Sequence, residues 1–218
     1  MSGYRLILGN KSYSSWSLRA WLGLRQAGID FEERVIPMYT EEWERDIKSE
    51  SPTGKVPVLQ HDGRFIWDTL AILEYAAERH PEAGLWPTDE EARALARSVS
   101  AEMHSGFMAL RSNMPMILLK TFPGKGIGEG VAEDIARICQ IWRDCRARFG
   151  GSGDLLFGSF TIADAMFAPV VSRFETYGVD LDDTCRAYAE AVRGLSAMRQ
   201  WREEALAEPW VIDRYDPA

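Results

Sequence analysis

The hydrophobic pattern of this chain changes near Pro81, and this change limits the possible folds more than any other feature. Up to that residue, short apolar runs of strand length alternate with helical patterns in the order β-α-β-α-β-β-α. Beyond Thr88 no convincing strand pattern occurs, and apolar residues recur at helical spacing. We therefore predict a small α/β domain over residues 1–81, a linker over 82–87 and an all-helical domain over 88–218.

Capping and turn residues mark the elements of the first part. A serine-rich stretch at 14–17 offers N-caps for the first helix, and Gly28 is suited to end that helix. The pair Asp62-Gly63 lies between two strand-like runs, which is a strong signal for a hairpin.

Two capping sequences occur in the second part. The sequence at 88–91 predicts the start of a long helix that runs through Met103 and Leu110. The sequence at 161–164 has the same pattern and predicts another helix start.

Charge and hydropathy exclude several classes of protein. The 218 residues include 25 Lys and Arg against 33 Asp and Glu, a formal net charge of −8. Negative charge repels phosphate backbones, which disfavours a nucleic-acid partner. No run approaches the ~18 apolar residues of a membrane-spanning helix, and the apolar run near the N-terminus is too short for a signal peptide. We expect a cytoplasmic protein with no membrane partner.

The three cysteines have no paired spacing, which favours reduced thiols over a disulfide framework. The three histidines, His61, His80 and His104, show no metal-ligand spacing with each other or with the cysteines. We therefore expect no metal site.

Ser14 and Ser15 stand at the predicted start of the first helix. Helix capping alone is the simpler interpretation of these residues. The alternative is an anion or thiolate site, because a hydroxyl and free N–H groups at a helix N-terminus favour negative charge and lower a thiol pKa. Both interpretations stay open from the residues alone.

Two further pairs point to the same end of the sheet. A proline that begins a strand is tolerated in the trans form, which is the better expectation for Val56-Pro57 from the residues alone. A cis bond would turn the Val56 backbone toward an extended ligand. Asp68-Thr69 caps a helix that follows a neighbouring strand, at the kind of sheet edge where ligands collect.

Taken together, these motifs resemble the soluble glutathione S-transferases over essentially the whole chain. The resemblance is carried by the order and spacing of four stretches: residues 14–19, 54–59, 68–75 and 161–164. It implies a thioredoxin-like N-terminal domain that binds glutathione and a helical-bundle domain that supplies most of the pocket for an electrophile. It also implies a homodimer.

The resemblance assigns roles to individual residues. Ser14 would hydrogen-bond the glutathione thiolate, with Ser15 as the substitute donor and Tyr13 as a further alternative. The remaining glutathione contacts would come from Val56 before a cis Pro57 for the cysteinyl part, from Asp68 and Thr69 for the γ-glutamyl end, and from Lys55 for a carboxylate. The sequence at 161–164 would be a folding cap without a catalytic role.

The serine-rich stretch looks like that of the zeta class, whose members include maleylacetoacetate isomerase. Trp16 stands where the zeta pattern has a cysteine, which puts that reaction in doubt. No cysteine occurs in the first 138 residues, so a cysteine nucleophile at the first helix is not expected. We predict that Tyr13, His104, Phe107 and Arg111 contribute to the electrophile pocket.

Three functions compete on this basis. The first is a transferase that activates glutathione as a thiolate for attack on a small electrophile. The second is a glutathione-dependent isomerase of the maleylacetoacetate isomerase type. The third is a transferase-fold protein that binds partners without catalysis.

Overall fold

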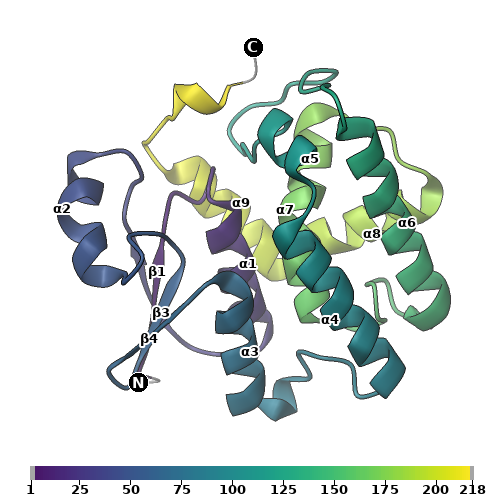
Figure 1. The fold of residues 1–218 in the computed structure, drawn as a ribbon, viewed down its shortest axis with the longest axis horizontal. Coiled ribbons are helices and arrows are strands. Elements are labelled where there is room, and N and C mark those ends of the chain that lie inside the picture. Colours follow the sequence, from purple (N-terminus) through teal and green to yellow (C-terminus); the bar gives the residue numbers. More distant parts are fainter. Residues whose placement is uncertain (1–2, 217–218) are drawn as a thin grey trace.

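A four-stranded mixed sheet forms the centre of the first part of the chain (Figure 1). The computed structural model describes residues 3–216. The strand order is β2-β1-β3-β4, and the strands are β1 (Tyr4–Leu8), β2 (Glu32–Val35), β3 (Val58–His61) and β4 (Arg64–Trp67). β1 pairs in parallel with β2 and antiparallel with β3, and the Asp62-Gly63 turn joins β3 to β4 as an antiparallel hairpin.

Helices cover both faces of the sheet, which explains the continuous apolar run in β1. Leu6 and Leu8 pack into the main core beneath α1 (Ser15–Gln26) and α3 (Thr69–Arg79). Ile7 points to the opposite face and packs with Ile47 of α2 (Glu41–Glu50). The alternation of side chains along the strand therefore separates the two helical layers.

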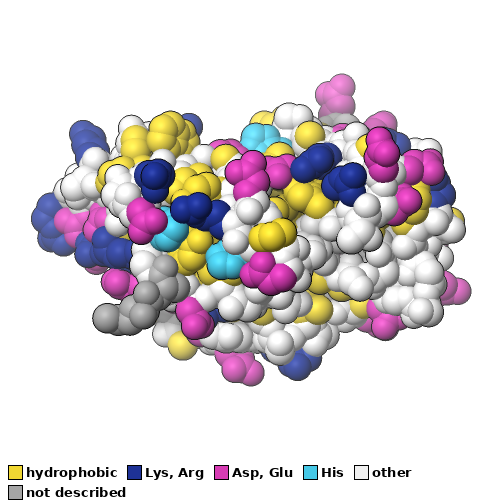
Figure 2. Space-filling model, turned by 90° about the horizontal axis from the view of Figure 1, so that it is seen from below, with side chains coloured by type: hydrophobic (Ala, Val, Ile, Leu, Met, Phe, Trp, Pro, Cys, Tyr) yellow, Lys and Arg dark blue, Asp and Glu magenta, His cyan; other side chains and the backbone are white. Residues whose placement is uncertain are grey.

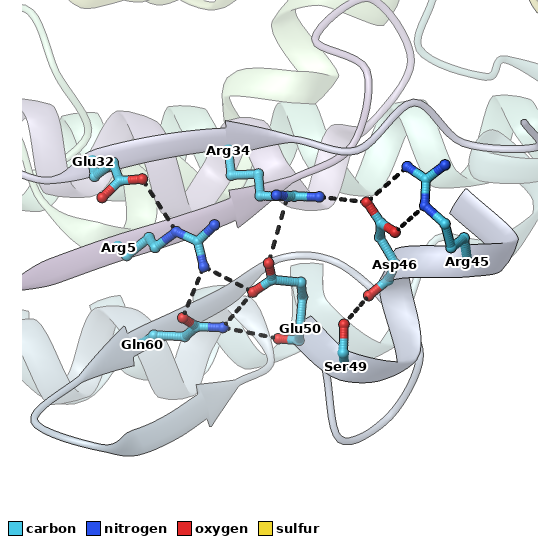
Figure 3. Close-up of polar contacts among 8 residues, drawn as sticks. All are labelled: Arg5, Glu32, Arg34, Arg45, Asp46, Ser49, Glu50 and Gln60. Carbon is cyan, nitrogen blue, oxygen red and sulfur yellow. Dashed lines mark hydrogen bonds and ion pairs between the residues drawn. The ribbon is translucent and has the colours of Figure 1, made fainter. Parts of the chain in front are cut away.

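Charged side chains also connect α2 to the sheet (Figure 3). Glu50 at the end of α2 accepts a hydrogen bond from Arg5 of β1 at 2.9 Å and lies 3.5 Å from Arg34 of β2. Arg34 also donates to Asp46 at 2.5 Å. Only a few apolar residues pack between α2 and this face of the sheet, and these polar contacts connect the two elements as well.

The second part of the chain contains six α-helices in its described residues, and the predicted fold class is confirmed. They are α4 (Glu90–Ser105), α5 (Met108–Asn113), α6 (Val131–Phe149), α7 (Ile162–Tyr177), α8 (Asp183–Gly194) and α9 (Ser196–Ala207), with 3₁₀ turns at Pro81–Ala83 and Asp213–Tyr215. α7 is buried along nearly its whole length and packs against both α1 and α4. It therefore joins the helical part to the sheet part (Figure 1).

One helix prediction was wrong. The helix that starts near residue 90 does not continue through Leu110, because it ends at Ser105 and α5 begins only at Met108. Phe107 has a φ of +61°, which no α-helix allows. Met103 and Leu110 are both buried and are spaced as on one face of a single helix. The sequence pattern therefore did not reveal the break between them. The N-cap of α4 is Asp89, one residue later than predicted, since Asp89 accepts the hydrogen bond from Ala92 N–H.

The surface carries charges of both signs. On the face shown in Figure 2, acidic and basic side chains are interspersed with apolar ones, without a continuous basic stripe. Within residues 3–216, no helix is both long enough and apolar enough to cross a membrane.

A buried lysine links α9 to the sheet part. Lys11 is 5% exposed, and its Nζ lies 2.6 Å from Glu33 of β2 and also contacts Glu204 of α9. Glu33 accepts two further hydrogen bonds, from Trp21 at 2.7 Å and from Arg25 at 2.6 Å. Burial alone would raise the pKa of Glu33, but the hydrogen bonds from Lys11 and Trp21 outweigh it and leave the pKa below its usual value.

We expect Glu33→Gln to lower the free energy of unfolding by about 1–3 kcal/mol at neutral pH, because it leaves Lys11 with one partner fewer. A lowered folded-state pKa contributes stability above the unfolded value of 4.5, and that contribution is lost as the pH falls through the folded value. Urea unfolding should therefore show a difference between the two proteins that shrinks in acid. Glu32→Gln is the control, since Glu32 is exposed and pairs only with Arg5. A difference that persists unchanged in acid would contradict this account.

Candidate active site

Two adjoining cavities lie where α1, α3 and the segment before β3 meet α4 and α5. The serine-side cavity, of 440 Å³, is lined by residues that include Ser14, Ser15 and Arg111. The aspartate-side cavity, of 560 Å³, is lined by residues that include Pro57, Asp68 and Thr69. Four residues line both cavities: Trp16, Lys55, Val56 and His104. The structure therefore brings most of the predicted site residues into one continuous region.

Ser14 is the N-cap of α1, as its position in the sequence predicted. Its Oγ accepts from Ser17 N–H at 3.3 Å and donates to Ser17 Oγ at 2.8 Å. Ser17 Oγ in turn accepts from Gly9 N–H at 3.0 Å. Ser17 was not singled out from the sequence, although its spacing of three from Ser14 is the spacing of a capping contact.

Ser15 is 7% exposed and its hydroxyl hydrogen-bonds to no other described residue. The Tyr13 hydroxyl, by contrast, already accepts from Ile212 N–H at 3.1 Å, and the Tyr13 ring stacks against Tyr215. All three side chains line the serine-side cavity. The helix start therefore presents both serine hydroxyls, while Tyr13 also holds the C-terminal segment.

The Val56–Pro57 peptide bond is cis, as the resemblance implied and in contrast to the trans form that the residues alone favour. β3 begins only at Val58, so the Val56 N–H and C=O lie outside the sheet ladder and have no partner among residues 3–216. Lys55 is exposed at the edge of both cavities and forms no ion pair with a described carboxylate. These groups fit an extended peptide-like ligand with a carboxylate.

Asp68 caps α3 in a strained conformation. Its φ is +68°, a value that costs a non-glycine residue about 1–3 kcal/mol and that clusters at ligand sites. Its Oδ1 accepts from Leu70 N–H at 2.9 Å. The Thr69 hydroxyl donates to the Trp16 carbonyl at 2.9 Å, so it already has an acceptor. The Thr69 N–H is one of the donors at this helix start that have no acceptor among the described residues. A carboxylate fits such a position.

The predicted electrophile residues are only partly brought together. His104 Nε2 lies 2.8 Å from Asp68 Oδ2, so it belongs to the wall shared by the cavities. Arg111 lines the serine-side cavity from α5 rather than from α4. Phe107 lines neither cavity, because its left-handed backbone turns it into the core, where it is 7% exposed. Met108, which is 64% exposed, lies at the cavity in its place.

Arg173 is the main site residue that the sequence did not reveal. It lies in the C-terminal half of α7, is 4% exposed and lines the serine-side cavity. Its Nε donates to the Met114 carbonyl at 2.8 Å, whereas its buried Nη1 has no hydrogen-bond partner in the described chain. Burial and the positive charge of Arg111 lower the pKa of Arg173 to about 9. The only sequence signal was a charged residue within a strongly apolar helix.

Three arginines in this region lack a direct ion pair, although the charges of Asp68 and Asp134 act on Arg19 and Arg111. Arg19 is fully buried beside Trp16, and both of its Nη atoms lack partners. Burial lowers the pKa of Arg19, and the neighbouring charges of Arg111 and Arg173 lower it further. None of these three guanidinium groups forms an ion pair with a carboxylate of residues 3–216. A buried cationic cluster of this kind favours an anionic ligand.

The same region holds no arrangement suited to a metal. No group of three or more His, Cys, Asp or Glu side chains within the described residues is placed to ligate an ion. The donors at the two helix starts, the free Val56 backbone and the arginines can instead bind and orient organic anions, and can stabilise a thiolate.

Two family models match this chain. The model described as "Glutathione S-transferase, N-terminal domain" matches residues 13–79, and the model described as "Glutathione S-transferase, C-terminal domain" matches residues 126–204. The matched residues include all the predicted glutathione contacts from Ser14 to Thr69.

Curated relatives share most of their length with this chain. Maleylacetoacetate isomerase of Rattus norvegicus is 34% identical over 180 residues, which are 78% of each chain. A probable maleylacetoacetate isomerase of Caenorhabditis elegans is 29% identical over 185 residues, 83% of this chain and 84% of its own.

Solved structures show the same fold. A glutathione transferase homologue from Burkholderia, with bound glutathione, has a TM-score of 0.72 at 25% identity and covers 94% of this chain and 99% of its own. A maleyl pyruvate isomerase of the zeta class has a TM-score of 0.70 at 22% identity, with 94% and 98% covered, which shows a likeness of fold.

Proposed function

Because this chain belongs to the glutathione S-transferase family, we propose that it is a glutathione-dependent isomerase of a small anionic cis-enone, of the maleylacetoacetate isomerase type. The observation that carries this proposal is the position of Arg111 and Arg173, two cations without carboxylate partners, in a cavity that also contains Ser14 and Ser15. The similarity to maleylacetoacetate isomerases supports the choice of reaction.

Glutathione would occupy the aspartate-side cavity. The free Val56 N–H and C=O would pair with its cysteinyl backbone. Asp68 would bind the γ-glutamyl amino group, and the Thr69 N–H at the start of α3 would bind the adjoining carboxylate. Lys55 would pair with a carboxylate of the ligand.

Bound glutathione supplies a thiolate nucleophile that adds reversibly to an activated double bond. Ser14 donates a hydrogen bond to the thiolate, and the N-terminus of α1 favours its negative charge. Arg111 and Arg173 hold the anionic electrophile and stabilise the negative charge that develops on its carbonyl oxygen. Isomerisation and conjugation share these steps, so they differ in whether glutathione leaves the product again.

A conjugating transferase is the second candidate. The observation that favours it is the apolar part of the serine-side cavity, which would accept an uncharged electrophile; this part is formed by Met38, Trp43, Met108, Pro115 and Met116.

One experiment separates the possibilities. A cis-4-oxo-2-alkenoate is incubated with the protein and glutathione, while product geometry and free glutathione are both followed. We expect the trans isomer to form with no consumption of glutathione. Stoichiometric loss of glutathione would show a conjugating transferase, and failure to bind glutathione would leave a partner-binding protein with the same fold. The methyl ester of the same compound, which lacks the negative charge, is the control and should react more slowly.

The division at residues 81 and 88, the homodimer and the cytoplasmic location remain predictions. We expect self-association to involve β4, the edge strand of the sheet, where Phe65 is 42% and Trp67 is 46% exposed; Trp67 also lines the aspartate-side cavity. Aromatic residues exposed on an edge strand are typical of interfaces.

A further inference from the structure

Trp16 forms part of the wall between the two cavities. It is the second residue of α1, is half-buried and lines both the serine-side and the aspartate-side cavity. Its ring lies 5.0 Å from the guanidinium carbon of Arg111 and 4.8 Å from that of Arg19. The His104 ring meets it edge-on at 5.2 Å. A single aromatic side chain thus contacts groups from both predicted substrate sites.

The Trp16 ring is an aromatic face beside the Arg111 guanidinium, on which the charge of Asp134 also acts. The Arg111 guanidinium donates to three backbone carbonyls, those of Gly106 at 2.9 Å, His104 at 3.2 Å and Met103. It forms no ion pair with a described carboxylate. An aromatic face attracts a cation and is stiff, so the Trp16 ring limits where this cation can lie.

We infer that Trp16 is a positioning residue: it fixes the Arg111 guanidinium in the serine-side cavity and thereby sets the preference of this cavity for a carboxylate over an uncharged group. This inference rests on the proposed function, because it takes Arg111 as a contact of the anionic electrophile. The zeta-class pattern has a cysteine at this position, and a cysteine offers no comparable face to a cation.

The backbone of Trp16 has a separate role that helps to design the test. Its carbonyl accepts the hydrogen bond from the Thr69 hydroxyl, and any substitution of the side chain keeps that carbonyl. Replacing the ring therefore changes the surroundings of Arg111 and Arg19 while it leaves the link to the start of α3.

The test is the affinity of the protein for a saturated 4-oxo acid and for its methyl ester, measured by calorimetry without turnover. We expect Trp16→Leu to lose roughly tenfold in affinity for the acid but less than about twofold for the ester, the range of a partly desolvated cation–π contact. Trp16→Phe retains an aromatic face and should restore most of the preference. Trp43→Leu is the matched control, since Trp43 lines the same cavity without a cation–π contact to an arginine, and should change both affinities alike.

Equal losses for the acid and the ester in Trp16→Leu, or a Trp16→Phe variant no better than Trp16→Leu, would overturn the inference. A wild type that does not prefer the acid would also overturn it. If Trp16→Leu does not fold, the comparison of Trp16→Phe with Trp43→Phe replaces it. Trp16→Phe should lose about two- to threefold in affinity for the acid and none for the ester, and Trp43→Phe should not show this difference. Glutathione thiolate formation is measured in parallel, and its absence from the wild type would count against the proposed function rather than against this role of Trp16.

Discussion

Replacing Ser14 with alanine is expected to raise the pKa of the bound glutathione thiol toward the free-thiol value of ~8.5. A hydroxyl donor together with a helix N-terminus is sufficient to lower a thiol pKa by about 2 units, or about 2.7 kcal/mol. The variant loses the hydroxyl and keeps the helix N-terminus, so it loses part of that shift. Loss of the whole shift would reduce the thiolate fraction at neutral pH roughly 25-fold, which is the upper limit for the fall in turnover. The measurement is the ultraviolet absorbance of the thiolate, titrated against pH with glutathione bound.

The neighbouring serines make this prediction more specific. The Ser14 hydroxyl donates to Ser17 Oγ in the present structure, so it must turn from Ser17 toward a thiolate. The Ser17 hydroxyl can then donate to Ser14 Oγ, which keeps the number of hydrogen bonds constant. Ser17→Ala should consequently raise the thiol pKa by a smaller amount than Ser14→Ala.

Ser15→Ala tests the alternative donor. The Ser15 hydroxyl is unpaired and lines the same cavity, so it can compete for the thiolate. If Ser15→Ala raises the thiol pKa more than Ser14→Ala, Ser15 is the main donor and the assignment is reversed. An unchanged thiol pKa in both variants would show that neither serine hydroxyl stabilises the thiolate. Tyr13→Phe would then be the next variant to measure.

The sequence was sufficient to predict the parts of this structure that depend on local chemistry. Ser14, Gly28 and the Asp62-Gly63 turn fix helix ends and a hairpin through their own backbone preferences, and all of them lie where they were predicted. The two helix starts converge because sheet topology places them at one edge. The positions of these two helix starts could therefore be predicted from the sequence, whereas the roles of their residues as glutathione contacts follow from the family resemblance and stay predictions.

Features that depend on long-range packing could not be predicted from the local sequence. Arg173 is brought to the cavity by the burial of α7 between α1 and α4. Its place in an apolar helix makes it unusual, but the local sequence does not indicate that it reaches this cavity. The helix breaks at Gly106, where a Cβ would lie 2.8 Å from the Glu102 carbonyl oxygen. The helical spacing of apolar residues continues across this break, so the sequence pattern does not reveal it. The hydrogen bond of the Thr69 hydroxyl could not be predicted either, since its acceptor is the carbonyl of Trp16, which is distant in sequence.

Asp164 is the residue whose loss should destabilise the fold most. It is fully buried at the start of α7, and its carboxylate accepts from Leu156 N–H at 3.1 Å, from Thr161 N–H at 2.8 Å and from the Thr161 hydroxyl at 3.0 Å. With Thr161 it forms the capping box that the sequence predicted. The carboxylate therefore ties the preceding loop to the helix that joins the two parts of the molecule.

Asp164→Ala leaves two buried N–H groups and a hydroxyl without an acceptor, and each unsatisfied buried group costs about 1–3 kcal/mol. We expect a loss of about 3–5 kcal/mol in the free energy of unfolding, a large part of the ~5–15 kcal/mol that stabilises a typical domain. Urea unfolding at about pH 8 is the measurement, because burial raises the pKa of Asp164 to about 6 and the carboxylate must be ionised in the reference protein. Asp182→Ala is the matched control: Asp182 caps α8 by the same type of contact but is exposed, so its loss should cost only about 1 kcal/mol. Equal losses in the two variants would mean that the buried network around Asp164 contributes no more than an ordinary cap, and that α7 is held by apolar packing alone.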